Sequence, residues 1–158
     1  MVPHARSFLS DNDTLHVSAA FRIASSTEDR LKAFMVRCIV FCGEQAVPYS
    51  IERDEFEDSA VHILGELEGE PVAAGRLRCF PEYAKLERIA VLRPYRGRGI
   101  GLELTRFLIS LAQERGYSSH RMNAQVQSEA FYARLGFHAT GERFLEAGIE
   151  HVLMIRDD

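Results

Sequence analysis

The sequence has few of the features that take a chain out of a reducing compartment or into a membrane. Its three cysteines, Cys38, Cys42 and Cys79, are an odd number without the spacing of a disulfide framework, which favours a reducing cytoplasm. No apolar run approaches the roughly 20 residues that a membrane-spanning helix needs. Met1–Asp13 lacks the apolar segment of a secretory signal. We therefore expect a cytoplasmic protein without a membrane partner.

The sequence also lacks a large excess of positive or negative charge. The net charge is -4 over 158 residues, which gives no general reason to expect nucleic acid as a partner. With 46% hydrophobic residues and no repeat or linker, the chain is typical of one globular domain. We expect residues 1–18 to be a lead-in of uncertain order and residues 19–158 to form a single domain.

A metal site has little support. Cys38 and Cys42 are four residues apart on a predicted helix and could share a face. A metal would need further ligands nearby, and none of the six histidines has zinc-like spacing. We interpret the two residues as thiols of the apolar core and expect no metal.

Hydrophobic periodicity predicts a mixed order of elements. A helix follows the capping pair Ser26 and Asp29 and fades near 43–48, before an acidic loop at 52–58. Two further helices are predicted from Ile100 to Arg115 and from Ser128 to Leu135. Strands are expected at 20–24, 61–68, 71–80, 85–92, 119–124, 137–145 and 151–156. This order indicates a mixed α/β or α+β domain, because strands and helices do not alternate regularly.

The most informative segment is IAVLRPYRGRGIG, from Ile89 to Gly101. A strand leads into a loop with alternate glycines, and an amphipathic helix starts at once. Glycines allow close approach of a ligand, and the helix N-terminus offers unpaired N–H groups, so together they suit a pyrophosphate. A P-loop would need Gly-Lys-Ser/Thr, and a dinucleotide fingerprint would need Gly at Leu102. A solvated connecting loop is the remaining alternative.

Five motifs resemble the GNAT superfamily of N-acetyltransferases or one of its branches. R-G-R-G-I-G is similar to its coenzyme A signature, with Arg96, Gly99 and Gly101 at the fixed positions. The N-A-Q…F-Y-A-R-L-G-F stretch of 123–137 resembles its distal motif. V-F-C-G-E-Q-x-V-P, L-E-R-I-A-V and F-L-E-A-G-I-x-H-V resemble the ElaA/YjcF-like branch. The likeness spans about residues 20–156. It implies the GNAT fold, with a mostly antiparallel sheet of six to seven strands, splayed in the middle and flanked by helices.

The resemblance implies acetyl-CoA as co-substrate and direct attack by a primary amine, in a small molecule or a peptide, within a ternary complex. The sequence has no G-x-S-x-G motif and no cysteine with an obvious general base beside it, so it shows no activated nucleophile that would argue for an acyl-enzyme instead. Assembly into a homodimer is left open by the sequence. The implied cofactor-binding residues are Ile89, Ala90, Val91, Arg96, Gly97, Arg98, Gly99, Ile100, Gly101, Asn123 and Tyr132.

The same resemblance implies catalytic roles for Tyr132 and Glu87. Tyr132 would be the general acid that protonates the departing thiolate; a packed aromatic is the alternative. Glu87 would be the base, because strand alternation places Glu87, Ile89 and Val91 on one face. The open alternatives are an ion pair, with Arg88 or another partner, and a water chain as base.

Residues for the acceptor follow from the branch resemblance alone: Glu44, Gln45, Tyr49, Arg76, Arg78 and His151. Arg76 and Arg78 share a strand face that could meet an anionic acceptor, although a solvated face is the commoner situation. His151 could equally be a packed strand residue.

Three rival functions remain. Asp54–Asp58 ahead of R-L-R faintly resembles acyl-homoserine-lactone synthases, which generally lack the glycine loop. L-E-R-I-A-V also resembles a glucosamine-6-phosphate acetyltransferase strand, but Arg88 departs from that pattern. A non-catalytic module that binds acyl-CoA as a sensor is the third.

Overall fold

A single sheet organises residues 18–158, which are the residues that the computed structural model describes. The lead-in predicted for residues 1–18 lies outside them, apart from Ser18. The sheet has seven strands in the order β1-β2-β3-β4-β5-β7-β6. Its strands are β1 (Ala20–Ile23), β2 (Val61–Leu67), β3 (Glu70–Cys79), β4 (Ala84–Val91), β5 (Ser119–Gln125), β6 (His138–Glu146) and β7 (Ile149–Asp157). Neighbouring strands are antiparallel except β4 and β5, which confirms the predicted mixed α+β sheet.

The three predicted helices form close to their expected positions, and a short helix at Tyr49–Glu52 was not predicted. The helices are α1 (Thr27–Arg37), the π-helical segment η1 (Cys38–Glu44), α2 (Tyr49–Glu52), α3 (Ile100–Glu114) and α4 (Glu129–Ala133), with 3-10 turns at η2 (Arg93–Tyr95) and η3 (Val126–Ser128). Ser26 caps α1 by accepting a hydrogen bond from the Asp29 N–H at 3.1 Å, as the capping pair predicts. Cys38 and Cys42 lie in the π-helical segment and are only partly buried.

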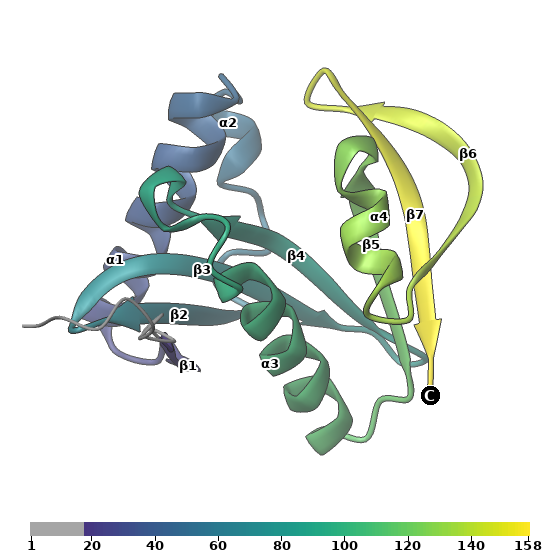
Figure 1. Ribbon diagram of the computed structural model, residues 1–158, viewed down its shortest axis with the longest axis horizontal. Coiled ribbons are helices and arrows are strands. Elements are labelled where there is room, and N and C mark those ends of the chain that lie inside the picture. Colours follow the sequence, from purple (N-terminus) through teal and green to yellow (C-terminus); the bar gives the residue numbers. More distant parts are fainter. Residues whose placement is uncertain (1–17) are drawn as a thin grey trace, which may run out of the picture.

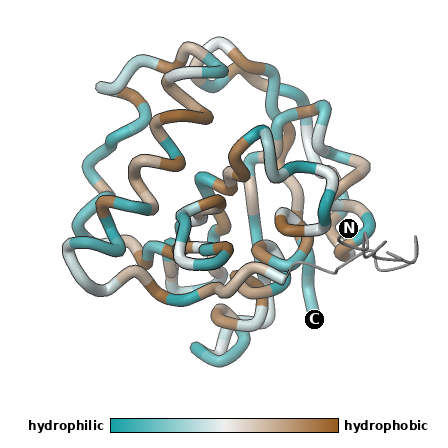
Figure 2. Tube along the Cα trace, turned by 60° about the vertical axis from the view of Figure 1, so that its left-hand side comes forward, coloured by the Kyte–Doolittle hydropathy of each residue, from teal (hydrophilic) through white to brown (hydrophobic). Residues whose placement is uncertain are grey.

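The helices cover both faces of the sheet (Figure 1). On one face Val36 of α1 packs with Leu64, Ala74 and Ala90. The other face holds the larger core, in which Leu104 and Leu108 of α3 pack on the strands. Hydrophobic residues recur along these helices and strands in Figure 2. Helix α3 comes close to β3, because a Cβ added at Gly75 would lie 3.0 Å from Leu108.

Strands β4 and β5 stay paired only at their first residues. The pairs are Ala84 with His120 and Lys85 with Arg121, although β4 continues to Val91. Arg88 has a φ of 52°, and the β3–β4 register shifts between Ala74 and Arg76. An extra residue of this kind bends a strand and increases its twist. Beyond this point β4 diverges from β5, which is the predicted splay (Figure 1).

The bulge at Arg88 corrects the predicted alternation. Leu86, Ile89 and Val91 all pack against the core under α3, which strict alternation would not allow. The extra residue reverses which face each later side chain meets, because the side-chain period of a strand is two. Glu87 is opposite Arg76 in the register and lies on the α1 face, away from Ile89 and Val91.

A buried ionic network fixes the acidic loop to the sheet. Arg76 is only 1% exposed, so its predicted solvated environment is wrong. Its five N–H donors are all engaged by carboxylates. Nε and Nη2 donate to Glu87, and the two terminal nitrogens donate to Asp54 and Glu57 at 2.7–2.8 Å. Arg37, also 1% exposed, binds Glu52 and Glu57.

We predict that Arg76→Met destabilises the fold by about 3–5 kcal/mol, because it leaves buried carboxylates unpaired. Arg78→Met is the control, since the Arg78 guanidinium is more exposed and has a single carboxylate partner, Glu87; its loss should be about 1 kcal/mol. Urea unfolding at neutral pH measures both. Similar small losses would contradict the importance of this network.

The network also predicts acid sensitivity. Burial raises the pKa of Asp54, but hydrogen bonding to Arg76 outweighs it and holds the pKa at about 2. A lowered folded-state pKa contributes stability above the unfolded value near 3.8, and this contribution is lost as the pH falls toward 2. The urea midpoint should fall across this window, and by less in Arg76→Met. An equal fall in both proteins would contradict the assignment.

Candidate active site

A cleft of about 730 Å³ opens where β4 and β5 diverge. One wall is β4 with the glycine loop and the start of α3. The other wall is the end of β5 with η3 and α4. Its lining includes Gln45, Glu87, Ile89, Ala90, Val91, Arg96, Gly97, Gly99, Ile100, Gly101, Asn123, Tyr132 and His151 of the predicted site. Glu44, Tyr49, Arg76, Arg78 and Arg98 do not line it.

The glycine loop presents bare backbone to this cleft. Gly97 and Gly99 have φ values of 76° and 84°, and a Cβ at either would meet no atom within 4 Å. Glycine is therefore required there by backbone conformation rather than by crowding. Gly99 caps α3 without a side-chain hydrogen bond. Among the described residues, the N–H groups from 97 to 102 have no hydrogen-bond partner, so they are free to donate to an anion at this helix N-terminus.

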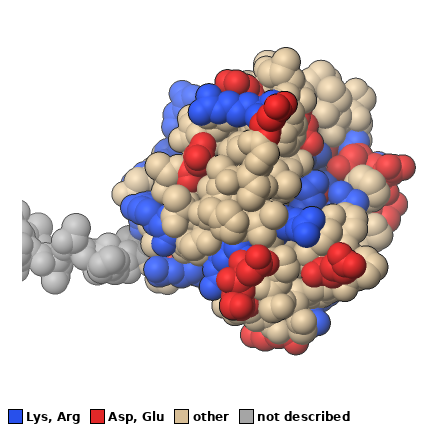
Figure 3. Space-filling view, turned by 90° about the vertical axis from the view of Figure 1, so that its right-hand side faces the viewer, with Lys and Arg blue, Asp and Glu red and all other residues tan. Residues whose placement is uncertain are grey.

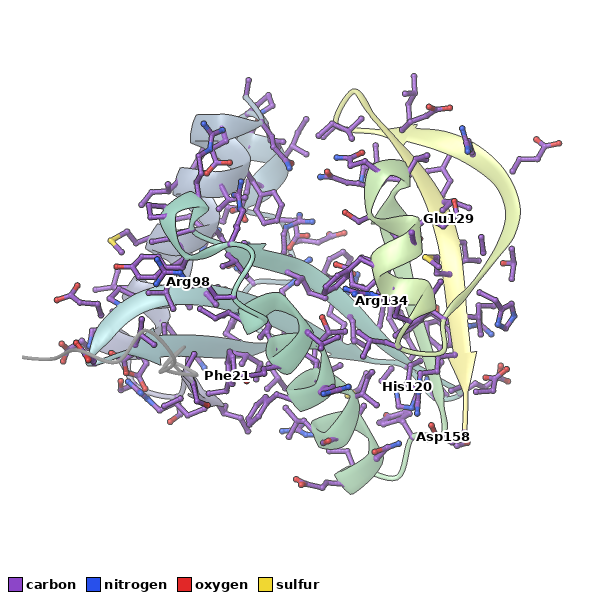
Figure 4. The ribbon with its side chains drawn as sticks, viewed as in Figure 1. Phe21, Arg98, His120, Glu129, Arg134 and Asp158 are labelled. Carbon is purple, nitrogen blue, oxygen red and sulfur yellow. The ribbon has the colours of Figure 1, made fainter. Side chains whose placement is uncertain are left out.

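The side chain of Arg96 holds the loop in place. Its Nε donates to the Val91 carbonyl at 2.9 Å, and Nη2 donates to Glu44 at 2.8 Å. Glu44 is thus a partner of the loop rather than part of a cavity wall. Arg98 lies on the loop, and Arg134 directly follows α4 (Figure 4). Arg134 lines the cleft and was not predicted.

Tyr132 lies in the cleft from the α4 side. Its ring packs edge-on against Phe131 and Phe137, with centroids 5.0 Å and 6.2 Å apart. Burial raises the pKa of Tyr132 to about 12. The hydroxyl is therefore protonated at neutral pH and can donate a hydrogen bond.

Glu87 lines the same cleft but is held by cations. Its carboxylate accepts from Arg76 at 2.5 Å and from Arg78 at 3.1 Å, and Lys85 lies 3.2 Å away. Burial raises the pKa of Glu87, but the Arg76 charge and the other cations outweigh it and lower the pKa. Glu87 therefore forms its ion pair with Arg76 and not with Arg88. The Arg88 guanidinium donates instead to Asp54 and to the Glu52 carbonyl.

A second cavity of about 220 Å³ adjoins the cleft on the side of α2. Tyr49 does not line it either and is 61% exposed. Two carboxylates, Glu52 and Asp54, contribute to its wall. The two cavities share six lining residues, Phe41, Gln45, Arg88, Gln125, Glu146 and His151. We call these six the junction.

The junction contains residues that the sequence analysis missed, namely Phe41, Gln125 and Glu146. Gln45 and Gln125 exchange two side-chain hydrogen bonds of 2.8 Å and 3.3 Å. They are 80 residues apart, so only the folded chain shows the pair. The available signal was that Gln125 and Glu146 fall inside the quoted N-A-Q and F-L-E-A-G motifs.

Comparisons with known proteins identify the family of this chain. Residues 26–157 match the model of the acetyltransferase (GNAT) domain. The chain belongs to the GNAT acetyltransferase family. It is accordingly an acyltransferase, and the GNAT fold predicted from the sequence is confirmed.

Its relatives support the ElaA/YjcF-like branch of GNAT proteins. The chain is 41% identical to the uncharacterized N-acetyltransferase YjcF of Bacillus subtilis, over 85% of this chain and 98% of YjcF. It is similar to the crystal structure of Escherichia coli ElaA, with a TM-score of 0.80 and 25% identity over 89% and 100% of the two chains. A GNAT acetyltransferase from Elizabethkingia anophelis, solved with acetyl-CoA bound, has the same fold, with a TM-score of 0.66 and 17% identity over 88% and 97%.

Two further observations concern metals and membranes. Within residues 18–158, no group of three or more His, Cys, Asp or Glu side chains is arranged to hold a metal ion. None of the described helices is both long and apolar enough to span a bilayer. Acidic and basic side chains are interspersed on the face shown in Figure 3.

The glycine loop gives a matched test of the anion site. Gly99→Ala places a side chain at a φ of 84°, which costs about 1–2 kcal/mol, and it should also weaken coenzyme A binding. Gly116→Ala is the control, because Gly116 has a φ of 90° and follows α3 outside the cleft. It should lose similar stability and keep full affinity. Calorimetric titration with coenzyme A distinguishes them, and equal affinities would contradict the assignment.

Proposed function

We propose that this protein transfers the acetyl group of acetyl-CoA to a primary amine by direct attack in a ternary complex. The observation that carries the proposal is the row of unpartnered N–H groups from 97 to 102, which lies beside the divergence of β4 and β5. An anion site and an open strand edge thus occur in one cleft. Acetyl-CoA offers a pyrophosphate for the first and an amide-bearing arm for the second.

The cofactor would lie along the cleft from the glycine loop to the bulge. The pyrophosphate accepts hydrogen bonds from the loop amides, and Arg134 adds positive charge from the end of α4. The pantetheine amides pair with β4 at 89–91, where β4 has lost its β5 partner. Asn123 faces the arm from β5. This placement brings the thioester close to the bulge and to Tyr132.

Tyr132 would act on the leaving group as a hydrogen-bond donor. With a pKa of about 12, its proton is held more tightly than that of a thiol, whose pKa is about 8.5. Tyr132 therefore stabilises the departing thiolate through an O–H···S⁻ hydrogen bond. The thiolate then takes its proton from the new amide nitrogen through the same hydrogen bond or through water.

The transfer and the role of Tyr132 are tested together. We expect acetyl-CoA to be consumed with at least one member of an amine panel. In Tyr132→Phe, kcat should fall about 100-fold, the scale of one lost donor to developing charge. The KM for acetyl-CoA should stay within about three-fold, since the ring remains. Tyr83→Phe, outside both cavities, is the matched control.

Two outcomes would contradict this account in different ways. An unchanged kcat in Tyr132→Phe would remove the proposed donor. A melting temperature that rises with acetyl-CoA, without consumption by any amine, would indicate a binding module rather than an enzyme of this kind.

A further inference from the structure

In the proposed placement the thioester lies close to the bulge at Arg88, and Arg88 is itself a junction residue, so the acceptor amine would meet the thioester at the junction between the two cavities. His151 of β7 is one of the six junction residues. It lies opposite Gln125 of β5 and opposite Phe144 of β6 in the sheet register. The Gln45–Gln125 hydrogen bonds hold the end of β5 beside it. A proton acceptor at this position would reach an amine before the amine reaches the thioester.

The contacts of His151 fix which ring nitrogen can accept a proton. Its Nδ1 lies 2.7 Å from the Ile149 carbonyl oxygen, and a carbonyl only accepts, so Nδ1 carries the hydrogen. In the neutral ring Nε2 then has the free lone pair. The ring stacks on Phe144, with centroids 5.9 Å apart and 21° between planes, which fixes its orientation.

A carboxylate lies beside the free nitrogen. Glu146 Oε2 is 3.7 Å from Nε2, too far for a hydrogen bond but close enough to stabilise a protonated ring. Glu146 is also a junction residue, and about half of its side chain is exposed. The two residues are thus arranged as a base with a counter-ion.

Glu87 is less suited to this task. Both of its carboxylate oxygens are occupied, one by Arg76 and the other by Arg78 and Lys85. The same cations lower its pKa, so it holds a proton poorly at neutral pH. Taking a proton would also leave Arg76 buried without one of its partners.

We propose that His151, with Glu146 as its counter-ion, is the general base that deprotonates the acceptor amine. The assignment rests on the proposed acetyl transfer. Nε2 takes one proton from the ammonium form, and the freed lone pair attacks the thioester carbon. The C–N bond forms, the C–S bond breaks with its electron pair on sulfur, and the second amine proton passes to the thiolate. Imidazolium then returns the first proton to solvent.

Charge around the junction agrees with an acceptor that arrives as an ammonium ion. Glu146 faces His151 from β6, and Arg88 faces it from β4. Glu52 and Asp54 face the second cavity from α2 and the loop after it. Gln45 and Gln125, from η1 and β5, are uncharged. Glu52 and Asp54 are already paired with Arg37 and Arg76, so the half-exposed Glu146 is the carboxylate that favours a cation beside His151.

The test compares His151→Gln with the wild type on one acceptor over a range of pH. We expect kcat/KM for the amine to fall at least 100-fold at neutral pH, and its acid limb to move up to the pKa of the amine, because the variant needs an acceptor that is already neutral. The ratio of wild-type to variant kcat/KM should shrink as the pH rises through the pKa of the amine, because the amine then arrives neutral. The KM for acetyl-CoA should change less than about two-fold.

Controls separate this role from packing. His138→Gln changes an exposed histidine of β6 outside both cavities and should behave as wild type. His151→Ala should regain activity when imidazole is added. An unchanged pH profile in His151→Gln, a loss equal at every pH, or no rescue by imidazole would overturn the proposal. Wild-type protein that acetylates no amine would instead overturn the proposed function itself.

Discussion

The site depends on one extra residue in β4. Arg88 has a left-handed φ of 52°, and its side chain is anchored to the carbonyls of Ile51 and Glu52. A non-glycine residue pays strain for this conformation, so those contacts are what keep it there. The resulting bulge bends β4 where it leaves β5, beside the cleft, and turns Ile89 and Val91 to the face opposite Glu87. The cofactor cleft and the ionic network therefore meet at a single backbone feature.

Different charged residues serve the ionic network and the cleft. Arg76 and Arg37 bind the acidic loop to the sheet and leave no donor of Arg76 for a ligand. Charge that reaches the cavities comes instead from Arg88, Glu146 and the loop side of α3. A chemical role for a strand carboxylate such as Glu87 would break the same contacts that hold the wall of the cleft.

What the sequence predicted well is what local patterns determine. The glycine loop, the capped helix and the order of elements along the chain follow from spacing within a few residues, and Gly97, Gly99 and Tyr132 line the cleft as the motifs indicate. The bulge was missed because Arg88 carries no turn signal, and strict alternation then put Glu87 on the wrong face. The pairing of Gln45 with Gln125, and of Arg76 with Asp54, joins segments that meet only after the sheet forms.

Binding of acetyl-CoA at the bare loop amides is central to the proposed function. Amide hydrogen exchange with and without acetyl-CoA tests this most directly, because the N–H groups from 97 to 102 have no partner among the described residues and should exchange fast in the free protein. We predict strong slowing at 97–102 and at 89–91, with none at 20–23. Slowing confined to other segments, or none, would contradict the account.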